Sequence, residues 1–499
     1  MSAKSFNEND DKIQISKKPI ETTSLDEDTT QSRLSYNTES QTTSSDNNNN
    51  KGYIGLHTPQ ILTSIEVVEV ENSEREANGD TMCQIFVQSF LPFFIGGIGS
   101  ILAGLLLTFS NKKLDLIADV PEFLILMPPL QGLKGNLDMT FSARLSTLAH
   151  IGAFDSPGIK DKVFRSAAVI EAQSIFVCII ANLVSLLMVL SERRGNYWNN
   201  FLFLGSSSIV SMAANFAVST LLLSLLVRYT WRKKLNPDNI VTPLGASFGD
   251  LLTIFSMLLI CYAIRPYSQF SNWIPGSIVI IALLCAPMWV FIASKDNTIL
   301  KYAKQQCITL VFASALSCIA GFIQQNAAGT YVNYPAYQTL ISGLTGNRCA
   351  VQASRISSYL EVNGKSELYW EERLSPISYF RSPCKESKTA RLLLFTSLPF
   401  QLFFVLISTL ISIATQSPVE DSAAFFIGYS IAVSIQVFII MYFTQLLVIF
   451  LWRMGFDPDI HAIPLLTSTA DVCGCLLLHL LFVVLGRLGY VRTKNSKDM

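Results

Sequence analysis

Two aspartates in the apolar part of the chain lie in matching sequence contexts. Asp250 follows Pro243 by seven residues, and Asp471 follows Pro464 by the same seven residues. A carboxylate near the middle of a lipid bilayer costs several kcal/mol unless it faces water or a cation. Because this cost is duplicated, the pair indicates a cation-binding site.

The prolines and nearby serines of these two blocks supply further oxygen atoms. Pro243 and Pro464 donate no backbone hydrogen bond, so each leaves a carbonyl free that can line a cation path. The alternative is an ordinary proline in the first turn of a helix. Ser247 and Ser468 either line the same path or hydrogen-bond the aspartates in a structural role.

A second motif also occurs twice, as GLKGNLDMTFSARLS at 132–146 and GLTGNRCAVQASRIS at 343–357, at a constant offset of 211 residues. Its glycines permit close helix contact, and Asn136 and Asn347 place amides in the membrane, where an amide needs partners. Asp138 adds a carboxylate that the second copy lacks. The aspartate blocks follow in the same order at an offset of 221 residues, which indicates an internal duplication.

The candidate ligands are carboxylates, amides, hydroxyls and carbonyls. Glu171 and Gln173, in another apolar segment, are additional polar candidates for the path. Hard oxygen ligands favour Mg²⁺ or Ca²⁺ over Zn²⁺ or Cu⁺. Two facing aspartates in a wet cavity suit hydrated Mg²⁺ better than a Ca²⁺ cage of six to eight protein oxygens. The residues alone therefore predict a path for a divalent cation, with no cofactor.

The elements that must position these residues are membrane-spanning helices. Of 499 residues, 50% are hydrophobic and 15% charged, with a mean hydropathy of +0.38, whereas a soluble domain has about 25% charged residues. A span needs about 20 mainly apolar residues. Eleven windows qualify, at 84–108, 121–150, 166–190, 201–228, 241–264, 274–293, 305–326, 335–360, 390–414, 422–451 and 461–486. The sequence predicts an all-α polytopic membrane protein.

The duplication divides the chain into two five-helix repeats joined by a linker helix. A repeat of five spans begins and ends on opposite sides of the membrane. Because a single further span separates the repeats, both enter the membrane from the same side and are parallel. We expect a disordered acidic cytosolic tail at 1–80, repeats at 81–265 and 301–488, a linker span at 266–300 and a C-terminal tail at 489–499.

The distribution of charge predicts how the chain is oriented in the membrane, and the net charge argues against nucleic acid as a partner. Lys and Arg are more numerous in those loops that lie inside when the N-terminus is cytosolic, which favours that orientation. We expect the plasma membrane as the location. Lys plus Arg and Asp plus Glu both number 37, so no net charge favours binding to nucleic acid.

The four blocks resemble those of the eukaryotic MgtE-like magnesium transporters, solute carrier family 41, across residues 84–486. The resemblance implies a transporter of Mg²⁺ and other divalent cations, with Na⁺ as a candidate coupling ion. It implies a single-chain pseudo-dimer in the lipid bilayer, equivalent to two bacterial five-span subunits. The family's membrane aspartate carries over to Asp250 and Asp471, which are expected to hold hydrated magnesium.

Two other classes of protein were weighed against a transporter. Paired membrane aspartates, one of them in the string FGD at 248–250, could form an intramembrane aspartyl protease dyad. Such proteases have different motifs around their two aspartates, whereas these contexts match. An organic-solute carrier would need an arginine pair or aromatic cage, and none repeats between the halves. A transporter, and not an enzyme, is therefore expected.

Overall fold

The computed structural model describes residues 82–113, 116, 119–150, 158–190, 197–233, 237–331, 333–363, 375–414 and 422–491. The tail expected at 1–80, and all but the first three residues of the tail expected at 489–499, lie outside these ranges. The described residues belong to one unit, Gln60–Met499.

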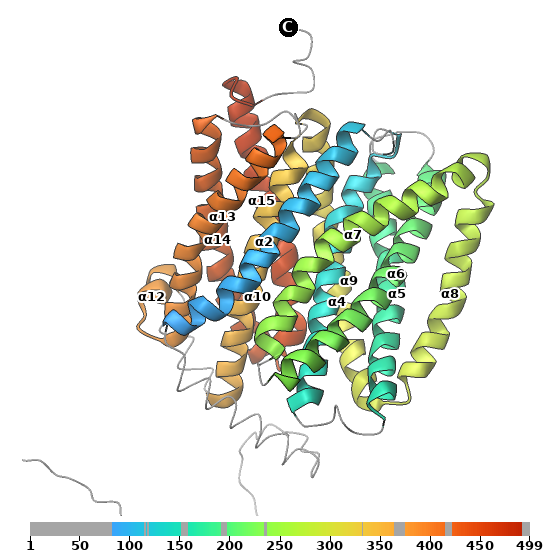
Figure 1. The fold of residues 1–499 in the computed structure, drawn as a ribbon, viewed down its shortest axis with the longest axis horizontal. Coiled ribbons are helices and arrows are strands. Elements are labelled where there is room, and N and C mark those ends of the chain that lie inside the picture. The colour runs from blue at the N-terminus through green and yellow to red at the C-terminus, as the bar shows by residue number, and fades with distance from the viewer. Residues whose placement is uncertain are drawn as a thin grey trace, which may run out of the picture. The chain divides into compact units, whose positions relative to one another are not determined.

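Each predicted apolar window coincides with one long helix (Figure 1). In chain order the long helices are α2 (Met82–Lys113), α4 (Glu122–His150), α5 (Ile159–Leu190), α6 (Tyr197–Arg232), α7 (Pro237–Phe270), α8 (Trp273–Ala293), α9 (Asn297–Thr330), α10 (Tyr334–Asn363), α13 (Lys385–Ala414), α14 (Ala423–Arg453) and α15 (Pro458–Arg487). The short helix α12 (Pro376–Arg381) precedes α13. The prediction of an all-α polytopic membrane protein is confirmed.

Among the described residues, nine helices are long and apolar enough to cross a membrane, and α4 and α10 are the two long helices that are not. These two contain the repeated glycine-asparagine motif. Protein surrounds both of them: α4 packs against α5, α6, α7 and α9, and α10 packs against α2, α13, α14 and α15. Their polar side chains therefore face other helices instead of lipid, which removes the need for an apolar surface.

The linker helix α8 has the opposite character. It packs against α5 and α6 at the edge of the bundle, and most of its side chains point away from the protein. Leu284 and Phe291 are 73% and 68% exposed, as expected for a surface in contact with lipid. In Figure 1, α8 connects the end of α7 to the start of α9, so α9 runs in the same direction as α2.

The helix packing follows the internal duplication when α2, α4, α5, α6 and α7 are matched to α9, α10, α13, α14 and α15. The pair α4–α7 matches α10–α15, and α6–α7 matches α14–α15. The first helix of each repeat also packs on the second helix of the other repeat, giving the contacts α2–α10 and α9–α4. The two halves are thus interlocked.

Two equivalent glycines make these cross-repeat contacts possible. A Cβ at Gly104 of α2 would lie 2.7 Å from the Ala336 carbonyl oxygen of α10, and a Cβ at Gly321 of α9 would lie 2.1 Å from the Ile125 carbonyl oxygen of α4. Only glycine permits helix backbones to approach so closely. These contacts hold α2 against α10 and α9 against α4, so each repeat is packed on the other.

Candidate functional site

The candidate site is a cavity of about 70 Å³ between the two repeats. Both motifs contribute to it from both halves of the chain. Its lining consists of Pro128, Gln131, Gly132, Gly135, Asn136 and Met139 of α4, Asp250 of α7, Gln338, Thr339, Ser342, Gly343, Gly346 and Asn347 of α10, and Thr467 and Asp471 of α15. Several of these form repeat-equivalent pairs, so the cavity lies where the two repeats face each other.

Both predicted aspartates line this cavity, and the motif glycines leave room for them. The Asp250 Oδ2 atom lies 3.4 Å from the position that a Cβ would take at Gly343. The Asp471 Oδ2 atom accepts a hydrogen bond of 3.3 Å from the Ser317 hydroxyl, and that hydroxyl lies 3.7 Å from the Cβ position of Gly132. Each acid is therefore next to the first helices of the repeats and the glycine-asparagine motif.

Ser100 and Ser317 lie next to residues of the cavity lining, and the sequence analysis missed both. Ser317 bonds to Asp471, and the Ser100 hydroxyl lies 2.7 Å from the Cβ position of Gly343, next to Asp250. The two serines begin a third repeated block, SILAG at 100–104 and SCIAG at 317–321, offset by 217 residues. A search for short repeats of small residues would have found it.

Asn136 and Asn347 also line the cavity, one from each repeat. Asn136 is buried, and its side-chain amide donates to the Thr467 hydroxyl across 3.5 Å. This bond joins α4 of the first repeat to α15 of the second. The sequence prediction that these amides have partners within the membrane is met at Asn136 by a residue from the other half.

The remaining candidates whose side chains the structure describes do not line the cavity. Ser468 is buried and donates to the Pro464 carbonyl across 2.8 Å, which is a bond within its own helix. Gln173 donates to the Ala303 carbonyl of α9 across 2.9 Å and so connects two helices. Glu171, on the same helix as Gln173, is likewise absent from the lining. The side chains of Pro243 and Ser247 lie outside the described residues.

Asp138 lies behind the wall of the cavity and not in its lining. It is 3% exposed and forms an ion pair with Lys134, one turn earlier on α4. The Ser219 hydroxyl of α6 donates to the same carboxylate across 3.2 Å. The sequence analysis overlooked Lys134, whose spacing of four residues from Asp138 on a helix predicts such a pair.

The chemistry of the cavity fits a hydrated cation. Two carboxylates supply negative charge, and amides and hydroxyls supply neutral oxygen atoms. Within the described residues there is no cluster of three His, Cys, Asp or Glu side chains that could hold a metal directly. An oxygen-lined acidic cavity inside a helical membrane bundle defines an ion transporter.

Comparison with known proteins identifies the family. The model of the MgtE family, described as divalent cation transporters, matches residues 127–260 and 338–481. The chain is 31% identical to solute carrier family 41 member 3 of Mus musculus, with 84% of this chain and 87% of that protein covered. It is 30% identical to solute carrier family 41 member 2 of Homo sapiens, with 83% and 72% covered. No solved structure matches.

This chain therefore belongs to the MgtE family of divalent cation transporters. The two matched segments run from α4 to α7 and from α10 to α15, so they include both glycine-asparagine motifs and both aspartates. The resemblance to solute carrier family 41 seen in the sequence is confirmed, and the protein is a transporter and not an enzyme.

Proposed function

We propose that the protein transports Mg²⁺ along a path between its two repeats, and that Asp250 and Asp471 hold the hydrated ion in the cavity. The observation that supports this proposal is the meeting of both acids and both motif asparagines in one cavity. The two carboxylates together balance the charge of one divalent cation. The chain would then work as a single-chain pseudo-dimer.

The size and lining of the cavity favour an ion that keeps its water. A cavity needs about 10–15 Å³ of water-accessible volume to hold one water molecule, so this cavity of about 70 Å³ has room for more than one. Mg²⁺ sheds water reluctantly and is usually bound by one or two carboxylates and several waters. Ca²⁺ would be better served by six to eight direct oxygen ligands.

Ion flux into proteoliposomes tests this proposal. We expect saturable uptake of Mg²⁺, with Ca²⁺ a weaker competitor because the cavity offers two carboxylates and not a full cage. Liposomes without protein give the background flux. Repeating the assay with an imposed Na⁺ gradient decides whether Na⁺ is the coupling ion. Absence of Mg²⁺ flux, or a clear preference for Ca²⁺, would contradict the proposal.

We further propose location in the plasma membrane with a cytosolic N-terminus. The excess of Lys and Arg in the loops that would then lie inside supports this orientation. Single cysteines in a cysteine-free protein test the orientation. Positions within 110–120 and 327–334 should react with an impermeant reagent from outside the cell, and positions within 361–389 only after permeabilisation. Reaction of the first two segments from opposite faces would mean inverted repeats, against the parallel arrangement.

A further inference from the structure

The two repeats differ in charge at two buried positions next to the cavity. The first repeat has Lys134 and Asp138 on α4, and the second has Thr345 and Cys349 at the equivalent positions on α10. All four side chains are buried. At these two positions, charge is thus found in the first repeat and not in the second.

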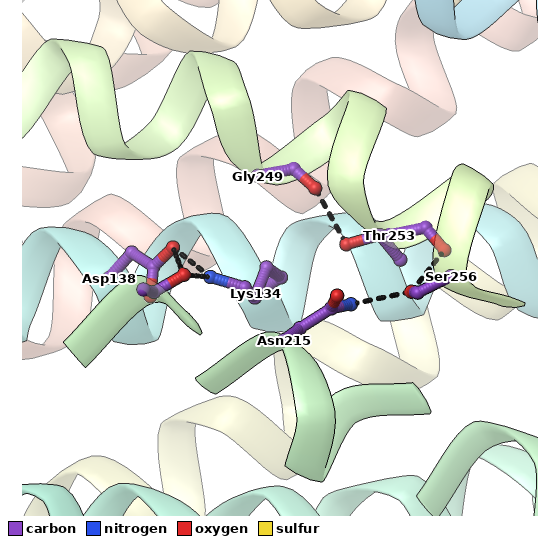
Figure 2. Close-up of polar contacts among 7 residues, drawn as sticks. Lys134, Asp138, Asn215, Gly249, Thr253 and Ser256 are labelled. Atoms are coloured by element: carbon purple, nitrogen blue, oxygen red, sulfur yellow. Dashed lines mark hydrogen bonds and ion pairs between the residues drawn. The ribbon is translucent and has the colours of Figure 1, made fainter. Parts of the chain in front are cut away.

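The charged residues form a closed unit between α4 and α6 (Figure 2). The Lys134 ammonium pairs with the Asp138 carboxylate and also donates to the Ser219 hydroxyl, which in turn donates to Asp138. The ammonium nitrogen lies 4.9 Å from the centre of the Phe216 ring, within the range of a cation–π contact. The pair is therefore fully enclosed by protein.

Helix α7 is shaped to accommodate this pair. A Cβ at Gly249 would lie 3.3 Å from the lysine Cγ, and a Cβ at Gly245 would lie 3.7 Å from the aspartate Cβ. The second repeat has larger residues at the equivalent positions on α15, Leu466 and Ala470. Small residues on α7 thus accompany the large charged pair, and larger ones on α15 accompany the smaller neutral pair.

The fold itself does not require an ion pair at this place. Removing two charges from water usually costs more than a neutral pair of similar volume, and the second repeat uses a neutral pair. There, the Thr345 hydroxyl donates to Gln436 of α14 across 3.2 Å. Stabilisation of the fold therefore does not explain the charged pair in the first repeat.

The position of the pair relative to the cavity suggests this role. Lys134 directly precedes Gly135 and Asn136, which line the cavity, and its Cγ lies 3.3 Å from the position of a Cβ at Gly249, which directly precedes Asp250. Both charges are enclosed by protein in a membrane bundle, where the field of a charge is weakly screened. An ion in the cavity therefore experiences repulsion from the ammonium and attraction to the carboxylate.

We propose that the Lys134–Asp138 pair sets the affinity of the cavity for the transported divalent cation. The Asp138 carboxylate, outside the lining, attracts the cation, and the Lys134 ammonium offsets that attraction. The ion can therefore bind and still leave, as transport requires. This inference rests on the proposed function, since it assumes that the ion occupies the cavity. Lys134 and Asp138 act on the ion through the field and not as ligands.

Replacing each charge separately tests the inference by the sign of the change in KM for Mg²⁺ flux. Lys134→Met leaves an uncompensated carboxylate, so KM should fall about tenfold and the maximal flux should also fall because release is slowed. Asp138→Asn leaves an uncompensated ammonium, so KM should rise about tenfold. The double variant Lys134→Thr with Asp138→Cys copies the second repeat, and its KM should stay within about threefold of the original.

Thr345→Val in the second repeat is the matched control, since it removes a buried polar group without a change of charge, and its KM should not change. Shifts of the same sign in both single variants, or unchanged KM values, would overturn the inference. If Lys134→Met does not fold, Lys134→Gln is used in its place, because glutamine keeps a hydrogen-bond donor. Its KM for Mg²⁺ flux should fall in the same way. The proposed function fails separately, through normal transport after loss of Asp250 and Asp471.

Discussion

Asp250→Asn and Asp471→Asn should each reduce Mg²⁺ flux about a hundredfold or more while leaving the protein folded. The amide keeps the shape of the side chain and one acceptor oxygen, and it removes the charge that offsets partial dehydration of a divalent ion. Both positions face the same cavity. Flux in proteoliposomes, normalised to the amount of inserted protein, measures the effect.

The double variant separates a shared site from two independent sites. If both acids hold one ion, loss of either already prevents binding, and the double variant should be little worse than each single variant. Glu171→Gln is the matched control, because it neutralises a carboxylate on α5 that does not line the cavity. Its flux should be close to that of the unchanged protein.

Near-normal flux through a well-inserted double variant would contradict the proposed path. Loss of folding in both single variants would instead support the structural interpretation, in which hydroxyls hold the acids. The bond from Ser317 to Asp471 makes Ser317→Ala informative here. With that hydroxyl removed, a purely structural aspartate loses the hydrogen bond from Ser317, and thermal unfolding in detergent would then show a lower midpoint.

The elements of this fold could be predicted from the sequence because each span is long and apolar. The segments of α4 and α10 were also predicted as apolar windows, although both helices fall below the hydropathy of a lipid-facing span. Their low hydropathy has a physical reason, since both are surrounded by other helices. Repetition was informative here because residues near the axis of a duplicated bundle recur in pairs.

The candidate site was only partly predictable, because repetition reveals only the residues that recur in both halves. Asp250, Asp471, Asn136 and Asn347 recur at fixed offsets, and all four line the cavity. Asp138 is absent from the lining, and a sequence shows a carboxylate without the direction in which it points. Only the structure shows that this carboxylate pairs with Lys134 and accepts a hydrogen bond from Ser219.

The second large effect is expected at the glycines that interlock the repeats. Gly321→Ala should destabilise the protein by about 3 kcal/mol, because the added Cβ would lie 2.1 Å from the carbonyl oxygen of Ile125. Backbone atoms cannot rotate out of the way, so α9 and α4 must separate. Gly104→Ala should have a smaller effect of the same sign, since its contact with the Ala336 carbonyl is 2.7 Å.

Gly329→Ala on the same helix is the matched control, because no atom lies within 4 Å of its Cβ position. There, alanine should stabilise the helix by less than the roughly 0.5–1 kcal/mol that it gives in the middle of a helix, because Gly329 is next to the last residue of α9. Thermal unfolding in detergent should thus move in opposite directions for the two variants of α9. Equal midpoints would show that α9 and α4 separate without cost. Because Ile125 lies one turn before Pro128 in the cavity wall, the folded fraction of Gly321→Ala should also transport less Mg²⁺.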